Sequence, residues 1–325
     1  MTRSISYVGH RMERPECVLT TKAGDIFCSH KRFGVARICA DGSQYALAQP
    51  TEIGGLPILA NGIALRDDGS FLVANISDAG GLLELDADGV RLLHPCSKTD
   101  QSPPVNFVTV DDLGKVWITV SSTFSPRSLA YNRQTANGYV AVIENGEMKV
   151  VVENLAYTNE CRLDYEGGWL YVAETMGQRI SRIRLDEKGV HGKVELYATM
   201  PRGAFVDGIE IDSEGAVLAA CIISSELIRV APDGSQEVIV GERDDAWVDD
   251  VEAVFDAGDM GRPQLDTSPT KKLKNIASLA YRNETLDQIV CGNLLDNKLP
   301  VFEAPVSGRP PVHWNVDVPI YGEAF

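Results

Sequence analysis

A polar residue followed eight positions later by glycine recurs along this chain, and it constrains the fold more than any other feature. Each copy runs through a short apolar stretch, a turn that holds the glycine and a second apolar stretch, which together predict a β-hairpin. Five copies begin at Glu16, Asn61, Asn106, Asn159 and Asp207. A sixth begins at Ser278 and lacks the glycine. We call these six residues the anchors; successive anchors lie 45 to 71 residues apart.

Each of the first five units also carries a second turn signal, with Gly42, Gly89, Gly146, Gly189 or Gly234 preceded by Asp, Asn or Lys. Glycine accepts the positive φ that tight hairpin turns need. Two hairpins make four strands per unit, which is typical of a β-propeller blade. The sequence therefore predicts an all-β, six-bladed propeller of four-stranded antiparallel blades around a central channel, as a single domain over residues 1–325. We expect the segment before Glu16 to add the outer strand of the last blade, so that the ring has no open edge.

Two units carry insertions, at residues 121–137 and 249–275. The first is polar, contains Pro126 and has no clean period, which indicates a loop. The second is acidic and contains glycine and proline. Both are consistent with surface decoration or with lids, because long loops on rigid scaffolds often carry function. Phe124 and Tyr131 of the first insertion are candidates for lining a pocket.

Composition excludes several classes of partner. The chain has 325 residues with 46 acidic and 30 basic side chains, a formal charge of −16. Nucleic acid and anionic membranes both require a basic face, so we expect neither as a partner and a small molecule instead. The N-terminus shows no signal peptide, and no apolar run is long enough to span a bilayer. The seven scattered cysteines predict buried, reduced thiols, which favours a cytoplasmic location.

Closure of a propeller would bring the anchors together at one mouth of the channel, because the first strand of each blade is innermost. All six anchors offer oxygen, two are carboxylates, and none is His or Cys. Such a ring suits a hard cation, Ca²⁺ first, with Mg²⁺ or Mn²⁺ as alternatives. The other interpretation is that Asn and Asp only cap turns where the strands begin.

Four stretches carry a family resemblance: RPECVL, ANGIAL, FVDGIEID and GNLLDNKLPVFEAPVSGRPPVHW. Their order and spacing resemble the gluconolactonase/regucalcin family of six-bladed propellers, which includes senescence marker protein and luciferin-regenerating enzyme. The resemblance implies one divalent cation held by Glu16, Asn159 and Asp207, which we expect to be Ca²⁺, with Mg²⁺, Mn²⁺ or Zn²⁺ as alternatives. It also implies that Asn106 contacts the substrate.

These roles predict a metal-dependent hydrolase that opens a lactone or related ester with an activated water. The cation would act as a Lewis acid on the carbonyl, and Asp207 is the candidate general base. No serine nucleophile is needed, and the chain has no G-x-S-x-G motif. The five histidines show no ligand spacing and are expected on the surface or in packing roles.

Departures from the family pattern bear on the substrate. Sugar lactonases of the family often read Arg-Phe-Asn-Asp where residues 104–107 read Pro-Val-Asn-Phe, and Glu160 stands where glycine is usual. We therefore expect a less polar or differently substituted lactone or ester rather than a simple sugar lactone. The predicted substrate wall comprises Asn61, Asn106, Phe107 and Glu160. The alternatives are a lyase or isomerase that uses the same cation, and a non-catalytic propeller that binds metal or ligand.

Overall fold

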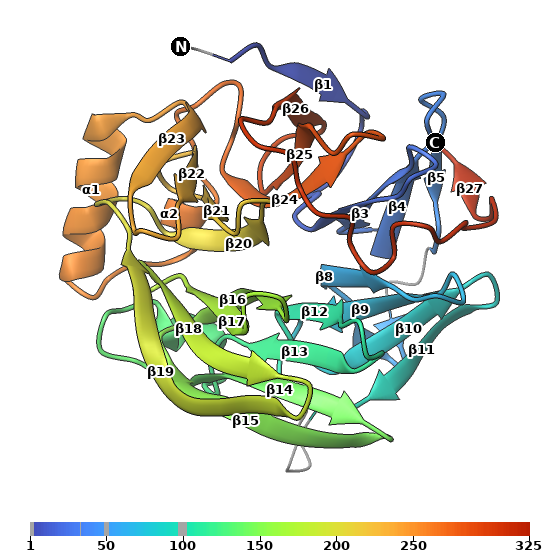
Figure 1. Cartoon of the computed structure of the whole chain (residues 1–325), viewed down its shortest axis with the longest axis horizontal. Coiled ribbons are helices and arrows are strands. Elements are labelled where there is room, and N and C mark those ends of the chain that lie inside the picture. Colours follow the sequence, from blue (N-terminus) through green and yellow to red (C-terminus); the bar gives the residue numbers. More distant parts are fainter. Residues whose placement is uncertain (1–2, 33, 49–51, 97–102) are drawn as a thin grey trace.

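The computed structural model describes residues 3–32, 34–48, 52–96 and 103–325. Six blades surround a central axis, which confirms the predicted six-bladed propeller (Figure 1). Each blade is an antiparallel sheet, and each innermost strand contacts the innermost strands of the two neighbouring blades. The six innermost strands are β2 (Val18–Thr20), β8 (Ala60–Leu65), β12 (Phe107–Val110), β16 (Thr158–Asp164), β20 (Val206–Ile211) and β24 (Ile276–Arg282).

The remaining strands of each blade follow outward in chain order. Blades one and two continue with β3 (Ile26–His30), β4 (Gly34–Ile38) and β5 (Gln44–Ala46), and with β9 (Phe71–Asn75), β10 (Leu82–Asp86) and β11 (Gly89–His94). Blades three and four continue with β13 (Val116–Val120), β14 (Gly138–Glu144) and β15 (Glu147–Leu155), and with β17 (Trp169–Glu174), β18 (Arg179–Asp186) and β19 (Gly189–Thr199). Blades five and six continue with β21 (Val217–Cys221), β22 (Glu226–Val230) and β23 (Gln236–Gly241), and with β25 (Gln288–Asn293) and β26 (Leu299–Glu303).

The two ends of the chain close the ring. The N-terminal β1 (Ser6–Val8) pairs with β26 as the outer strand of blade six, as predicted. The C-terminal β27 (Glu323–Ala324) pairs with β5 and gives blade one a fifth strand, which was not predicted. A small hairpin of β6 (Glu52–Ile53) and β7 (Leu56–Pro57) stands apart from the blades. Pairing of both outer strands leaves less exposed backbone at the seam.

Apolar side chains fill the spaces between neighbouring blades. The rings of Phe27 in blade one and Phe71 in blade two lie 5.0 Å apart, and both side chains are fully buried. All seven cysteines are free thiols, and only Cys39 is partly exposed. Within the described ranges, no helix is both long and apolar enough to cross a membrane.

The anchors lie at irregularities in the inner strands. Four of them, Asn61, Asn159, Asp207 and Ser278, lie inside their strands, between residues where the pairing register shifts. The prediction placed all of them before the strands, which holds for Glu16 and Asn106. A β-bulge breaks the alternation of side chains and re-aims one of them, so it can turn a polar side chain toward the channel mouth.

The predicted first-hairpin glycines adopt a positive φ in four units, at Gly24, Gly69, Gly114 and Gly215. In blade four the prediction named Gly167, but the positive φ of 72° belongs to Gly168. A side chain at Gly167 would collide with the Asp164 carboxylate, which accepts a hydrogen bond from the Gly167 backbone N–H at 3.0 Å. This turn is therefore shifted by one residue.

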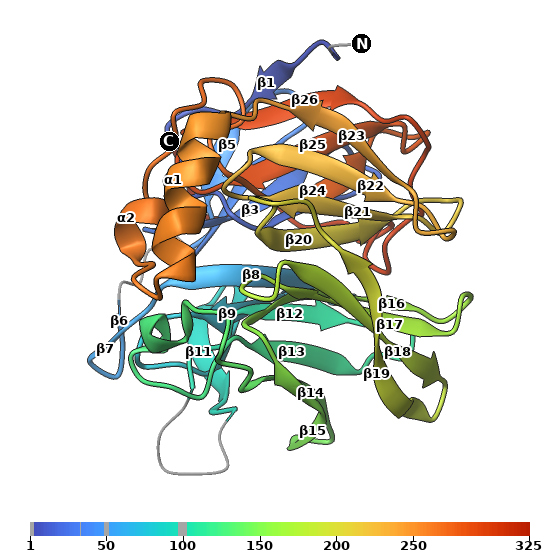
Figure 2. The same ribbon diagram turned by 90° about the vertical axis from the view of Figure 1, so that its left-hand side faces the viewer.

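Within the described residues, helices occur only in the two insertions and at the border of the second. The first insertion holds the 3₁₀ helix η1 (Arg127–Ala130), and the second holds α2 (Arg262–Leu265). The longer α1 (Asp245–Asp256) begins before the predicted insertion and was not predicted as a helix. Asp244 caps it by accepting from the Trp247 N–H, and it buries Val248, Val251, Glu252 and Phe255 along one face. Figure 2 shows α1 and α2 together at one end of the ring.

Candidate functional site

Four anchors from different blades meet at one mouth of the channel. Glu16, Asn106, Asn159 and Asp207 line a common cavity of about 30 Å³, which we call the anchor cavity. Each of these side chains is buried, with 3% to 6% of its surface exposed. The structure thus brings together the three predicted metal ligands and one predicted substrate contact. They are far apart in the sequence, so only ring closure makes them neighbours.

The carboxylates of the anchor cavity are buried close to other carboxylates. Burial, with the nearby Glu16 and Glu160 carboxylates, raises the pKa of Asp207 well above its usual range. The Asn159 side-chain amide donates a hydrogen bond to Asp207 Oδ1 and a second one, of 3.2 Å, to Thr175 Oγ1. Arg14 pairs with Glu16 at 2.7 Å. Two buried carboxylates that line one cavity repel each other, and a cation between them would relieve this repulsion.

The backbone before two of these anchors is left-handed. Arg14 has a φ of 52° and Tyr157 a φ of 64°, and each lies two residues before an anchor. Non-glycine residues adopt this conformation at a cost in energy that the surrounding structure must offset, and such residues cluster at functional sites. Here the turn places the Arg14 and Tyr157 side chains in the anchor cavity beside Glu16 and Asn159.

Asn61 and Asn106 form a connected pair at the edge of the site. The Asn61 amide donates to the Asn106 backbone carbonyl at 2.9 Å and to Asn106 Oδ1 at 3.3 Å. Asn106 Nδ2 in turn donates to Ser121 Oγ at 2.8 Å. Asn106 lines the anchor cavity, whereas Asn61 and Ser278 do not. Asn61 therefore orients the Asn106 side chain from outside the cavity.

Phe107 and Glu160, predicted at the substrate wall, face deeper into the channel. Phe107 follows its anchor and points to the other side, where the Arg162 guanidinium lies 4.9 Å from its ring. Glu160 is buried and pairs with Arg162 at 2.8 Å. Burial raises the pKa of Glu160 to about 7, against the opposing effect of Arg162. Neither residue lines the anchor cavity, so their effect on a ligand there would be indirect.

Both insertions reach the anchor cavity. Arg127 and Tyr131 of the first insertion line it together with Arg262 and Leu265 of the second, whereas Phe124 is 43% exposed and does not line it. Sequence reasoning missed Arg14, Tyr157, Arg127 and Arg262. The first two share a detectable signal, since both precede an anchor by two residues. The other two carried none, because their insertions follow no repeat.

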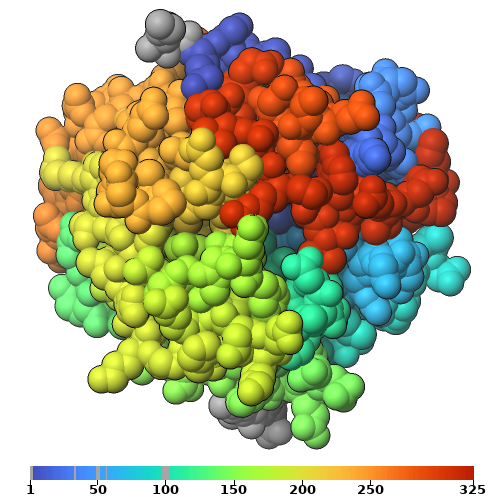
Figure 3. Space-filling view, in the orientation of Figure 1, coloured from blue at the N-terminus to red at the C-terminus, as the bar shows by residue number. Residues whose placement is uncertain are grey.

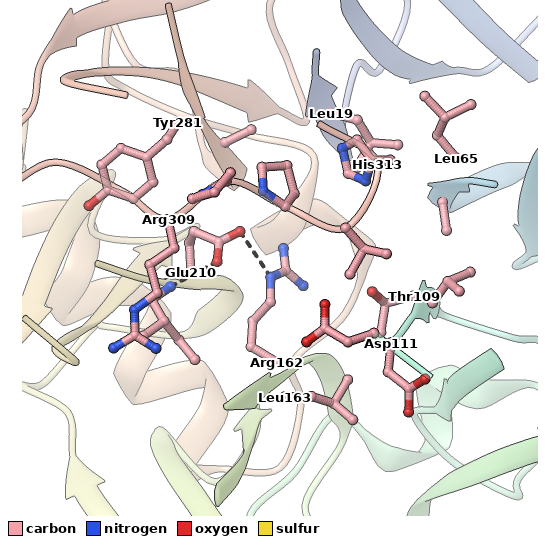
Figure 4. A pocket seen from close by; sticks show the side chains of 18 of the residues that line it. Leu19, Leu65, Thr109, Asp111, Arg162, Leu163, Glu210, Tyr281, Arg309 and His313 are labelled. Atoms are coloured by element: carbon pink, nitrogen blue, oxygen red, sulfur yellow. Dashed lines mark hydrogen bonds and ion pairs between the residues drawn. The ribbon is translucent and has the colours of Figure 1, made fainter. Parts of the chain in front are cut away.

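A larger cavity of about 300 Å³ occupies the other end of the channel. Figure 3 looks onto this end, where the surface is hollowed at the centre of the ring beside the C-terminal segment. In Figure 4 the Arg162 side chain projects into this cavity and bonds to Glu210, while Arg309 and His313 approach from the C-terminal segment. Despite its size, this cavity lacks the anchors and their set of oxygen ligands. We therefore place the candidate site at the anchor cavity.

The anchor cavity fits a hard divalent cation by its chemistry. Among the described residues, no three His, Cys, Asp or Glu side chains are clustered as metal ligands. The candidate ligands are two carboxylates, Glu16 and Asp207, and one amide, Asn159. A cluster defined by His, Cys, Asp and Glu alone does not count the amide. Carboxylate and amide oxygens are the ligands that Ca²⁺ prefers. The Asn159 amide now points its nitrogen toward Asp207. To bind a cation held by Asp207, the amide would have to turn its oxygen to this side instead.

The fold and the site together define a six-bladed propeller with buried oxygen ligands at one mouth of its channel. Residues 26–243 match the model of the SMP-30/gluconolactonase/LRE-like region, and the chain belongs to this family. A curated relative, 6-deoxy-6-sulfogluconolactonase from Pseudomonas putida, is 27% identical over 199 residues, which are 60% of this chain. This match spans 62% of the length of that relative.

Solved structures of family members share the fold over nearly the whole chain. The calcium-binding protein regucalcin from Agrobacterium tumefaciens has a TM-score of 0.66 at 16% identity and covers 96% of this chain and 98% of its own. A gluconolactonase from Xanthomonas campestris has a TM-score of 0.66 at 15% identity, with 93% and 89% covered. A luciferin-regenerating enzyme has a TM-score of 0.70 at 11% identity, with 98% and 100% covered. At these identities the likeness concerns the fold alone.

Proposed function

We propose that this protein is a divalent-metal-dependent hydrolase that opens a lactone or related ester at the anchor cavity. One observation carries the proposal: Glu16, Asn159 and Asp207, from three separate blades, line one buried cavity. Membership of a family that contains gluconolactonases supports the lactone, and the calcium-binding neighbour supports the cation. We propose Ca²⁺ as the resident metal, with Mg²⁺, Mn²⁺ or Zn²⁺ as alternatives.

Each side chain of the anchor cavity has a role in this proposal. A bound cation would supply Lewis acidity toward the lactone carbonyl and acidify a water. Glu16, Asn159 and Asp207 would hold it through their oxygens. Asp207 would also take the proton from the attacking water, since its carboxylate is buried at the same place. Asn106, fixed by Asn61 and Ser121, would orient the substrate.

Lactone hydrolysis with and without metal tests the proposal. Protein treated with EDTA is assayed in a pH-stat on a panel of γ- and δ-lactones, before and after Ca²⁺ is restored. Asp207→Asn is expected to lower kcat/KM by at least about 100-fold, as loss of a general base does. Ser278→Ala is the matched control, because it changes an anchor that does not line the cavity. Calorimetry should give one Ca²⁺ per chain in the control and none in Glu16→Gln.

The product and the metal content separate the alternatives. Hydrolysis adds one water to the mass of the substrate, whereas a lyase or isomerase leaves the total mass unchanged. Stoichiometric Ca²⁺ binding without turnover of any lactone would favour a non-catalytic binding propeller. Full activity in EDTA would contradict the metal dependence.

A further inference from the structure

Three arginines from three different segments surround the carboxylates of the anchor cavity. Arg14 comes from the start of blade one, Arg127 from η1 and Arg262 from the first turn of α2. The chain as a whole carries a formal charge of −16, so this group of cationic side chains at one cavity differs from the overall charge of the protein. The residues that enclose the candidate site are therefore of opposite charge to its metal ligands.

The three guanidinium groups differ in their partners. Arg14 pairs with Glu16 at 2.7 Å, and Arg262 pairs with Asp266, four residues further along the chain. Within the described part of the chain Arg127 forms no direct ion pair, although the nearby Glu16 carboxylate stabilises its charge. It is half-buried and lies beside the phenols of Tyr131 and Tyr157. A partly buried guanidinium that no carboxylate contacts directly keeps its N–H donors available to an anionic ligand.

The aromatic side chains beside Arg127 complete a pocket for a ligand group. The Tyr131 and Tyr157 rings meet edge to face with centroids 5.2 Å apart, and both residues are buried. Burial raises the pKa of the Tyr131 phenol, but Arg127, the Tyr157 hydroxyl and Arg262 together outweigh it and lower that pKa. The potential at this position is thus positive, and it favours an anion.

We propose that Arg127 and Arg262, with the Tyr131 hydroxyl, form a subsite for an anionic substituent of the substrate: a carboxylate, sulfonate or phosphate carried by the lactone. This inference rests on the proposed function, and it names the substrate class as anionic lactones. The lactone ring would lie toward Glu16, Asn159 and Asp207, and its anionic substituent toward the two insertions. A cavity of about 30 Å³ is smaller than such a ligand, so binding requires the side chains that line the cavity to rearrange.

The first part of the test compares a neutral and an anionic lactone. Glucono-δ-lactone and 6-phosphoglucono-δ-lactone are hydrolysed by calcium-loaded wild type, Arg127→Gln, Arg262→Gln and Arg127→Lys. Loss of one charge-assisted contact should lower kcat/KM for the anionic lactone by roughly 10- to 100-fold in Arg127→Gln, mostly through KM. Because Arg127 also lines the cavity in which the neutral lactone reacts, the readout is the ratio of the two kcat/KM values, which should fall by roughly 10-fold or more. Arg127→Lys should restore part of the loss.

The second part measures binding without turnover. Calorimetry with 6-phosphogluconate and gluconate, with Ca²⁺ and with EDTA, should show tighter binding of the phosphorylated acid and a loss in Arg127→Gln. Arg202→Gln is the control, because Arg202 is exposed, pairs with Asp249 and lies outside the cavity.

Equal losses for both lactones in Arg127→Gln, or unchanged binding of the phosphorylated acid, would overturn the subsite and leave lactone hydrolysis standing. Binding that depends on Arg127 without turnover of either lactone would uphold the subsite and overturn the hydrolase. Absence of both binding and turnover would overturn both.

Discussion

Arg133 and Glu252 form an ion pair of 2.8 Å that joins the two insertions of the propeller. Glu252 of α1 is 1% exposed and also accepts hydrogen bonds from the Gly203 N–H, at 2.7 Å, and from the Gln178 amide. The Arg133 guanidinium lies 4.5 Å from the Phe255 ring. The segments that carry Arg127 and Arg262 are thus connected to each other, and their position over the anchor cavity depends on this buried contact.

Removal of the Glu252 carboxylate should destabilise the protein. Glu252→Ala leaves the Gly203 N–H and the Gln178 amide without their acceptor and removes one of the partners of Arg133, at a cost of about 3 kcal/mol in the free energy of unfolding. Urea denaturation measures this change. Asp256→Ala is the control, since Asp256 contacts the same arginine but is 62% exposed, and its loss should cost less than about 1 kcal/mol. Equal effects of the two substitutions would show that the buried position of Glu252 is unimportant.

Asp111 is expected to be a second stability centre, at the turn that follows the inner strand of blade three. It accepts from Trp117 Nε1 at 2.8 Å and from the Tyr165 hydroxyl at 2.6 Å, and so links blades three and four. Asp111→Ala should lower the free energy of unfolding by about 2–4 kcal/mol, because buried donors lose their acceptor. Denaturation followed by tryptophan fluorescence checks this. The exposed neighbour Asp112 supplies the control, and Asp112→Ala should leave the midpoint nearly unchanged.

His313 should make the protein less stable in acid. Burial, assisted by the nearby Arg162, lowers the pKa of His313 to about 4 from a usual value of 6.5. Between these values the unfolded chain binds a proton that the folded protein excludes, so stability falls as the pH drops from 6.5 to 4. The loss attributable to this group is at most about 3 kcal/mol. The stability difference between wild type and His313→Gln, measured by urea unfolding across this range, should therefore shift against wild type in acid; a constant difference would contradict the shifted pKa.

Thiol labelling should detect one cysteine quickly. Cys39 is partly exposed, while the other six thiols are buried, with 3% exposure or less. A thiol reagent such as DTNB should therefore label about one group per native chain before the slow phase that accompanies opening of the fold. Cys39→Ser should abolish the fast phase. Fast labelling of several thiols would mean that the spaces between blades are open to solvent.

Much of the architecture could be predicted from local patterns. The polar anchor, the apolar runs and the turn glycines are short-range signals, and their repetition predicted six blades, the inner strands and closure by β1. The prediction was less accurate where a local choice depends on neighbouring atoms, as in the turn at Gly167 and Gly168. It missed α1 because the capping Asp244 and the apolar face of that helix lie at the border of an insertion that follows no repeat.

The candidate site divides in the same way. The repeat predicted which oxygen-bearing side chains would share one end of the channel, and Glu16, Asn106, Asn159 and Asp207 line one cavity there. It could not show that Phe107 and Glu160 face the other way, because the direction of a side chain next to a bulge depends on the pairing of the finished sheet. Nor could it place Arg127 and Arg262, which reach the site only because Arg133, Glu252 and the packing of α1 hold the insertions over it. The sequence by itself thus determined the ring and its oxygen ligands, since these follow from periodicity. The tertiary structure alone decided which charged side chains surround these ligands, because long-range contacts between insertions leave no periodic pattern in the sequence.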